Sequence, residues 1–197
     1  MESDALRVAV IAGSTRPDRK SGGIARWVLE RAAPLPAEFT LVDLVDHPLP
    51  FLDEPLPAIF ESYSRPHTRS WSALIDSFDA YVFVVPEYNR SIPAVLKNAL
   101  DYLHAEWRDK AAGFVGYGAD AFGARAVEHL RLVMGELQVA DVRAHVLLSA
   151  STDFTPDGRP RPPEHAEAQL ETMLGQVLAW GTALRGLRVP TVAQVAR

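Results

Sequence analysis

Ser14, Arg16 and Ser21 have side chains that can bind a phosphate group, and they lie in one polar loop of this 197-residue sequence. The loop spans residues 13–23 and follows an apolar run at 6–12 that is typical of a buried strand. Hydroxyls and a guanidinium fork bind phosphate oxygens well, and glycines let a ligand approach the backbone. We therefore predict a phosphate cradle, although the loop has neither the Walker spacing G-x-x-x-x-G-K-S/T nor the spacing G-x-G-x-x-G.

A second polar loop, residues 86–91, lies between an apolar run at 81–85 and a segment with helical spacing. The run is β-branched or aromatic throughout, which is typical of a strand covered on both faces. Apolar residues recur at 92, 95, 96, 99, 100 and 103, which indicates one apolar helical face. Ser91 is expected to be the N-cap of this helix, with Pro93 in its first turn. The start of a helix offers free amides and a positive dipole end to a ligand.

The other elements alternate in the same way along the chain. Further strands are predicted at 39–45, 111–117 and 142–148, and further helices from residue 24 and at 68–77, 124–137 and 164–185, with Gly186 as the last C-cap. A third polar loop, 116–123, follows the strand at 111–117. Residues 46–65 contain four prolines and are expected to form a long, semi-rigid loop at the rim of a site.

This alternation of strands and helices predicts an α/β fold with a doubly wound parallel sheet. We expect a flavodoxin-like three-layer sandwich, a five-stranded sheet in the order 2-1-3-4-5, and one domain over residues 1–197 with its core at about 5–186. In that order a crevice opens at the carboxyl ends of the first and third strands. The three polar loops are therefore expected to converge on one site.

Composition excludes several classes of function. The net charge of −5 disfavours a nucleic-acid partner, and a sequence without cysteine has no disulfides or thiolate metal sites and is compatible with the cytoplasm. We expect no signal peptide, no membrane span and no metal site, since the six histidines show no paired ligand spacing. A hydrolase is also disfavoured, because no G-x-S-x-G elbow occurs.

Four segments resemble the NAD(P)H-dependent FMN reductase family, which has a flavodoxin-like fold and includes quinone, azo-dye and chromate reductases. Residues 86–101 resemble its signature P-E-Y-N-x-S-x-P-x-x-L-K-N-A-x-D, and this match is the specific one. Residues 13–16 resemble the family's G-S-x-R loop, 107–110 its W-x-x-K, and 117–118 its third flavin loop. Ala94 and Ala119 depart from the family, which usually has glycine there.

The resemblance implies that FMN is bound where the loops meet. Its phosphate would be held by Ser14, Arg16 and the amides of Ser21, Gly22, Gly23 and Ile24. Its isoalloxazine would contact Pro86, Glu87, Tyr88, Asn89, Ser91, Tyr117 and Gly118. NADPH or NADH would supply a hydride, and FMN would pass it to a small acceptor such as a flavin, quinone, azo compound or metal oxyanion. No catalytic protein residue is expected, because the flavin carries the chemistry.

Alternatives remain open at this point. The same fold could serve a non-enzymatic electron carrier or a module that binds a phosphorylated ligand. Glu87 could be a general acid, but a solvated or backbone-anchoring carboxylate is favoured, and Trp107 is assigned to packing. The resemblance also implies a homodimer or homotetramer, and residues 100–107 keep apolar side chains beyond the part that the sheet can cover.

Overall fold

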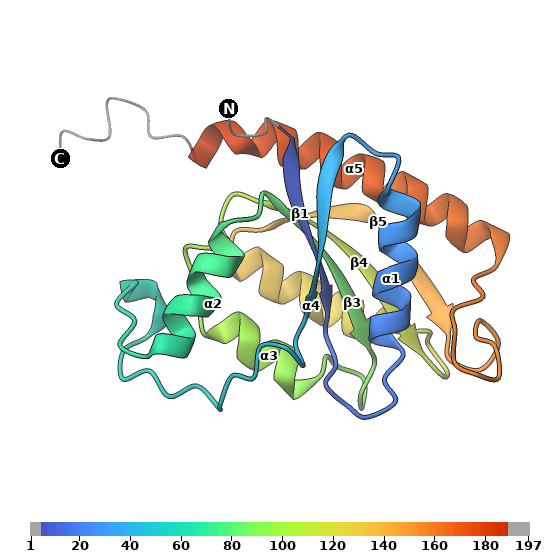
Figure 1. Ribbon diagram of the computed structural model, residues 1–197, viewed down its shortest axis with the longest axis horizontal. Helices are drawn as coiled ribbons and strands as arrows, with labels where there is room; N and C mark the ends of the chain where they lie inside the picture. The colour runs from blue at the N-terminus through green and yellow to red at the C-terminus, as the bar shows by residue number, and fades with distance from the viewer. Residues whose placement is uncertain (1–4, 189–197) are drawn as a thin grey trace.

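The computed structural model describes residues 5–188, which form a five-stranded parallel sheet (Figure 1). The strands are β1 (Leu6–Ala12), β2 (Ala37–Asp43), β3 (Ala80–Pro86), β4 (Ala111–Gly118) and β5 (Ala140–Ser149). Their order is β2-β1-β3-β4-β5, and every neighbouring pair is parallel. The predicted doubly wound, flavodoxin-like sheet is therefore confirmed.

Helices cover both faces of the sheet and give three layers. They are α1 (Ser21–Ala32), α2 (Pro66–Asp76), α3 (Ala94–Asp101), α4 (Ala124–Glu136) and α5 (Glu164–Arg188), and a short 3-10 helix, η1, spans Ala58–Phe60. Helices α1 and α5 pack on one face, while α2, α3 and α4 pack on the other (Figure 1). Parallel strands need such crossovers, because the chain must return to the amino-terminal end of the sheet before the next strand begins.

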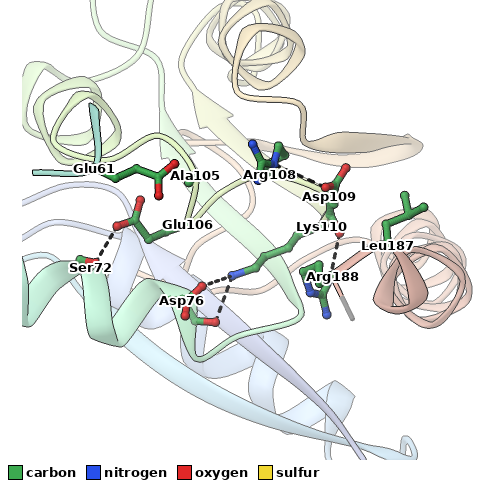
Figure 2. A pocket seen from close by; sticks show the side chains of 10 residues that line it. All are labelled: Glu61, Ser72, Asp76, Ala105, Glu106, Arg108, Asp109, Lys110, Leu187 and Arg188. Atoms are coloured by element: carbon green, nitrogen blue, oxygen red, sulfur yellow. Dashed lines mark hydrogen bonds and ion pairs between the residues drawn. The ribbon is translucent and has the colours of Figure 1, made fainter. Parts of the chain in front are cut away.

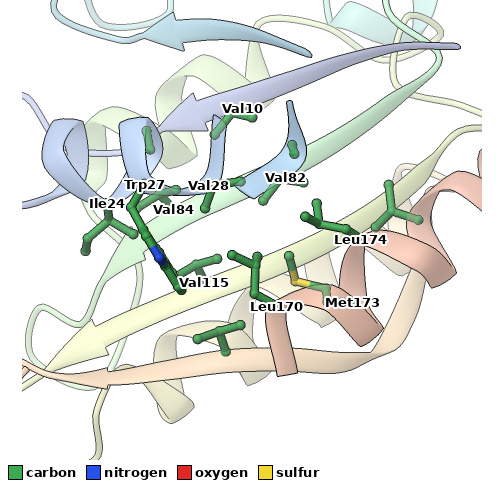
Figure 3. Close-up of a cluster of buried hydrophobic side chains, with 14 of the residues drawn as sticks. Val10, Ile24, Trp27, Val28, Val82, Val84, Val115, Leu170, Met173 and Leu174 are labelled. Atoms are coloured by element: carbon green, nitrogen blue, oxygen red, sulfur yellow. The ribbon is translucent and has the colours of Figure 1, made fainter. Parts of the chain in front are cut away.

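The sheet separates two hydrophobic cores. Alternate residues of each central strand point to opposite faces, so Val8 and Val10 join one core while Ala9 and Ile11 join the other. Figure 3 shows the first core, where valines of β1, β3 and β4 meet α1 and α5. Every residue of β3 is buried, as its continuous apolar run predicted. Burial on both faces makes the sheet a rigid base for the loops at its carboxyl edge.

Strand β2 begins and ends two residues before the predicted 39–45. It is an edge strand with alternating exposure, so backbone pairing with β1 fixes its limits more strongly than its apolar pattern does. The pairing runs from Ala37 to Asp43, and a turn in which the amide of Asp46 donates to the carbonyl of Asp43 ends it. The other strands and helices lie within two residues of their predicted limits, the usual scatter at element ends, except that α1 begins three residues before the predicted 24 and α5 ends three residues after the predicted 185.

The predicted caps at Ser91 and Gly186 are wrong. Helix α3 begins at Ala94 with Pro93 as its N-cap residue, and the hydroxyl of Ser91 instead shares a hydrogen bond of 3.0 Å with Nδ1 of His129 in α4. Helix α5 continues past Gly186 to Arg188, whose guanidinium donates to the carbonyl of Asp109. In both cases a tertiary partner outweighs the local capping preference.

The loop 46–65 is irregular apart from η1, as predicted, and it is fixed to α3. The Asn98 side chain donates to the carbonyl of Pro50 at 2.8 Å and accepts from the amide of Leu52 at 3.0 Å. The Tyr102 hydroxyl also donates to the carbonyl of Pro50, at 3.1 Å. The anchored loop leaves large apolar side chains in solvent, with Phe51 85% and Phe60 65% exposed.

Residues 100–107 do not form the exposed apolar surface that the sequence predicted. Leu100, Tyr102, Leu103 and Trp107 are all buried within the chain. The indole of Trp107 donates to the carbonyl of Leu100 and contacts other aromatic rings of the second core, so its packing role is confirmed. Among residues 5–188, no helix combines the length and hydropathy needed to cross a lipid bilayer.

Candidate active site

The three predicted polar loops meet at the carboxyl ends of strands β1, β3 and β4. A pocket of about 260 Å³ lies between them. It is lined by Arg16, Asp18, Arg19, Lys20, Pro86, Glu87, Tyr88, Tyr117, Gly118, Ala119 and Ala150. The position is the switch point of the strand order, where parallel α/β sheets bind ligands.

The first loop leaves β1 tightly packed against the neighbouring strand. The amide of Gly13 donates to the carbonyl of Val84 at 2.9 Å, and a Cβ on Gly13 would lie 3.0 Å from that oxygen. Ser14 is buried, and its hydroxyl and that of Tyr88 share a hydrogen bond of 3.0 Å. The first and second loops are therefore linked directly.

The start of α1 has unused hydrogen-bond donors. No acidic residue lies in its first turn, and the N-cap residue Lys20 makes no side-chain capping bond. The hydroxyl of Ser21 is buried near that of Tyr117, and it makes no hydrogen bond of good geometry among residues 5–188. Free helix-terminal amides and a buried hydroxyl without such a bond suit a phosphate dianion, and Arg16 lies exposed in the loop just before them.

The second loop is a two-residue turn in an unusual backbone conformation. The amides of Tyr88 and Ser91 each donate to the other residue's carbonyl, at 2.9 and 3.0 Å. Asn89 and Arg90 between them have φ angles of 50° and 70°, in the left-handed region that favours glycine. Two consecutive residues with positive φ form a type I′ turn, and an arginine at its second central position is strained.

Glu87 anchors this loop rather than facing a substrate as an acid. Its carboxylate accepts from the backbone amide of Arg125 at 3.2 Å and pairs with Nε of the same arginine at 3.2 Å. Its own amide donates to the carbonyl of Tyr117 at 2.9 Å. The favoured backbone-anchoring role is confirmed, and Glu87 joins the second loop to the third loop and to α4.

The third loop is held by close backbone contacts. Gly118 lies against Gly123, so that a Cβ on Gly118 would be 3.1 Å from the amide nitrogen of Gly123. Gly123 has a φ of 91°, and a Cβ there would lie 2.3 Å from the nitrogen of Tyr117. Tyr117 is buried at the pocket wall, and burial raises the pKa of its hydroxyl, which therefore stays protonated at neutral pH.

The structure places the predicted site residues in different settings. Arg16, Pro86, Glu87, Tyr88, Tyr117 and Gly118 line the pocket. Ser14, Ser21 and Gly22 are buried beneath the first loop, Ile24 is in the core, and Gly23 lines a neighbouring hollow. Asn89 is exposed at the tip of the turn, and the hydroxyl of Ser91 is engaged by His129.

Sequence reasoning missed five pocket residues. Asp18, Arg19 and Lys20 lie in the cradle loop, where their charge could have drawn attention, and Ala119 directly follows the Tyr-Gly pair. Ala150 comes from the end of β5, where its amide donates to the carbonyl of Gly118 at 2.8 Å. No sequence signal marks an alanine for such a position.

The comparison with protein families decides the family. The model of the family described as NADPH-dependent FMN reductase matches residues 6–153, a stretch that contains all three loops. The chain belongs to this family. The prediction of the family is confirmed, and with it the prediction of an oxidoreductase that uses FMN and NAD(P)H.

Curated relatives of this FMN reductase family member support the assignment. An NAD(P)H-dependent FMN reductase of Nectria sp is 34% identical over 157 residues, which cover 75% of this chain and 78% of the relative. A 2-hydroxy-1,4-benzoquinone reductase of Burkholderia sp is 35% identical over 141 residues, covering 68% of this chain and 73% of the relative.

A solved structure shows the same fold. The flavoenzyme NAD(P)H:(acceptor) oxidoreductase FerB from Paracoccus denitrificans is 20% identical in sequence and superposes with a TM-score of 0.70. The likeness covers 91% of this FMN reductase and 98% of FerB, so the two chains share almost their whole architecture.

Proposed function

We propose that this protein binds FMN in the pocket between the three loops and uses it to pass electrons from NAD(P)H to a small acceptor. A flavin, quinone, azo compound or metal oxyanion is the proposed acceptor. The observation that carries the proposal is the free start of α1, with the buried Ser21 hydroxyl, next to a pocket walled by the other two loops. Bound FMN supplies the chemistry of hydride transfer.

The chain's own residues would bind and orient the cofactor. Ser14, Arg16 and the amides at 21–23 would hold the phosphate, because a dianion gains from helix-terminal donors and a guanidinium. The amide of Ile24, which the sequence also suggested, instead donates to the carbonyl of Lys20 at 3.0 Å. Residues 86–89 would lie along one face of the ring system, with residues 117–118 at its far end. The hydroxyl of Ser91 is bonded to His129, so we assign Ser91 to shaping the turn.

One absorbance spectrum and one titration test the proposal. Freshly purified protein should be yellow, and NADPH should bleach it in anaerobic buffer. A yellow protein that NAD(P)H does not reduce would favour an electron carrier, and a colourless protein that does not take up FMN would favour a module for another phosphorylated ligand.

The phosphate cradle has its own test. Arg16→Ala should weaken FMN about tenfold to over a hundredfold, the worth of a charged hydrogen bond of roughly 1.5–3 kcal/mol, and should leave riboflavin nearly unaffected. Arg108→Ala, an exposed arginine just before β4 and thus at the opposite edge of the sheet, is the control and should change neither affinity. Equal weakening of both ligands by Arg16→Ala would contradict the assignment.

We propose a ping-pong course for turnover with a quinone. The loop 86–89 would shield one face of the flavin, so donor and acceptor would take turns on the other face. Double-reciprocal plots at several fixed acceptor concentrations should then be parallel, and high acceptor should compete with NAD(P)H. Intersecting lines with the flavin still bound would show that both substrates occupy the site together.

We also propose that the protein is a single FMN-binding domain that works in the cytoplasm as a homodimer or homotetramer, binding neither nucleic acid nor a membrane. Support for association comes from the anchored loop 46–65, which exposes Phe51, Leu52, Leu56, Ile59 and Phe60. Light scattering should give at least twice the chain mass of 21.6 kDa. Phe60→Asp should shift the protein toward monomer, whereas Leu132→Asp on α4, also exposed, should not.

A further inference from the structure

A second, larger hollow lies beside the proposed flavin pocket. It has a volume of about 900 Å³ and sits between α1 and the connection that follows β5. Figure 1 shows this connection, residues 150–163, next to α1. Asp18, Arg19 and Lys20 line both hollows, so the two are neighbours along the cradle loop. A ligand that extends from the flavin pocket into the second hollow would pass over residues 18–20.

The hollow has an apolar side formed by two elements. Pro156 and Pro160 of the connection line it together with Trp27 of α1, which is only 6% exposed and otherwise belongs to the first core. The indole nitrogen of Trp27 donates to Glu167 of α5 at 3.2 Å, which fixes the ring. Gly23 lets the connection come close, because a Cβ there would lie 3.3 Å from Cδ of Pro160. The volume is within the range of small-molecule sites, and the lining is mostly charged and polar.

Four cations line the hollow, and their partners differ. Arg159 pairs with Asp157 at 2.8 Å, on the surface. Arg19 pairs with Asp43 at 2.5 Å through Nη2, but its Nε is buried and has no hydrogen-bond partner within residues 5–188. Nζ of Lys20 lies 4.1 Å from the ring centre of Phe154.

Arg26 is the cation with the most freedom. Its side chain is exposed on α1, and no ion pair or hydrogen bond joins it to another side chain in the described part of the chain, although its guanidinium lies over Gly22 on the same side as the Asp43 carboxylate. Asp18, Glu30 and Asp157 also line the hollow, so its net charge is small. Recognition of an anion there must therefore come from individually placed donors, and the free fork of Arg26 is the best placed for a terminal phosphate.

We propose that this hollow takes the adenosine end of NADPH and that Arg26 binds its 2′-phosphate. Arg19 and Lys20, on the wall shared with the flavin pocket, would face the diphosphate that joins the two halves of the dinucleotide. The inference rests on the proposed function, because it assumes that the nicotinamide lies over the flavin. Since NADH has a hydroxyl in place of the 2′-phosphate, the arrangement makes NADPH the preferred donor.

Steady-state kinetics of the FMN-loaded protein provide the first test. Arg26→Ala should lower kcat/KM for NADPH about tenfold or more, mainly through KM, and should change the NADH value less than about twofold. Arg108→Ala is the control, because Arg108 is an exposed arginine just before β4, paired with Asp109 at 3.5 Å and not among the residues that line either hollow. This variant should change kcat/KM for neither NADPH nor NADH. A wild type that does not favour NADPH, or an Arg26→Ala variant that weakens both donors equally, would overturn the inference.

Calorimetric titration with adenosine 2′,5′-bisphosphate and adenosine 5′-monophosphate gives a readout that needs no turnover. Wild type should bind the bisphosphate at least about tenfold more tightly, and Arg26→Ala should abolish the difference. Equal affinity of wild type for both nucleotides would overturn the inference even if NAD(P)H is oxidised. Tight bisphosphate binding by a protein that oxidises neither donor would retain the adenosine site while the proposed function fails.

Discussion

Lys110 should make the stability of the protein rise with pH between neutrality and about pH 10. It lies directly before β4, at the amino ends of the strands and thus opposite the flavin pocket, and its side chain is buried (Figure 2). Its ammonium group donates to the carbonyls of Ile75 and Asp76, at 3.2 and 3.1 Å. Burial outweighs the nearby Asp76 carboxylate and lowers the pKa of Lys110 from 10.5 to about 8.

The sign follows from proton binding in the two states. Below pH 8 both the folded and the unfolded chain hold the proton on Lys110, and the cost of burying the charge is fully present. Between pH 8 and 10.5 the unfolded chain keeps this proton while the folded chain loses it, so the free energy of unfolding rises. The slope is about 1.4 kcal/mol per pH unit, which gives roughly 3 kcal/mol across the window.

Urea unfolding of wild type and Lys110→Met between pH 7 and 10.5 measures this effect. The difference between the two proteins removes the contributions of other groups, including the tyrosines, whose pKa values are raised by burial and which oppose the trend. The free energy of unfolding of wild type should rise by roughly 3 kcal/mol relative to that of Lys110→Met over that range. Lys97→Met, at an exposed lysine paired with Asp101, should give a flat difference. A flat or falling difference for Lys110→Met would show that Lys110 keeps an ordinary pKa when folded.

Three further predictions concern the loops of the site. Gly123→Ala should lower the free energy of unfolding in thermal melts by at least about 1–3 kcal/mol, because the added Cβ would collide with the backbone of Tyr117 and the φ of 91° is strained for alanine. Gly135→Ala in α4 is the control and should stabilise the protein slightly, because nothing lies within 4 Å of its added Cβ. Arg90→Gly should raise the free energy of unfolding in urea by up to about 1 kcal/mol, because relief of the left-handed strain exceeds the entropy that glycine adds to the unfolded chain, and a loss would show that the turn is not strained. Tyr88→Phe removes the bond to Ser14 and should weaken FMN severalfold in a fluorescence titration, and an unchanged affinity would show that this link does not shape the site.

Most of the fold could be predicted, because the apolar runs and helical spacings are long and agree with one another. The predictions fail where a residue distant in sequence determines the local structure. The hydroxyl of Ser91 meets His129, which is 38 positions away, so its capping preference was no guide. Residues 100–107 are apolar enough for an interface, yet Trp71 of α2 covers them, donating to the carbonyl of Ala99 at 2.9 Å and packing near Trp107.

The site could be predicted only in part for a related reason. Motif residues mark the loops, but the walls of the pocket also include backbone and small side chains brought in by other elements, as Ala150 shows. The exposed apolar surface was predicted at residues 100–107 but lies in the loop 46–65. The prolines of that loop indicate irregular structure, but they do not reveal that Asn98 and Tyr102 hold it in place.

The bonds between the three loops bear on the thermodynamics of ligand binding. Ser14 joins the first loop to Tyr88 of the second, Glu87 joins the second to the third, and Ala150 joins the third to the end of β5. Most of the conformational entropy of these loops is therefore lost during folding rather than at the arrival of a ligand. A preorganised site retains more of its contact energy as affinity. Breaking one of these links should make binding more favourable in enthalpy but more costly in entropy, even where the pocket walls are unchanged.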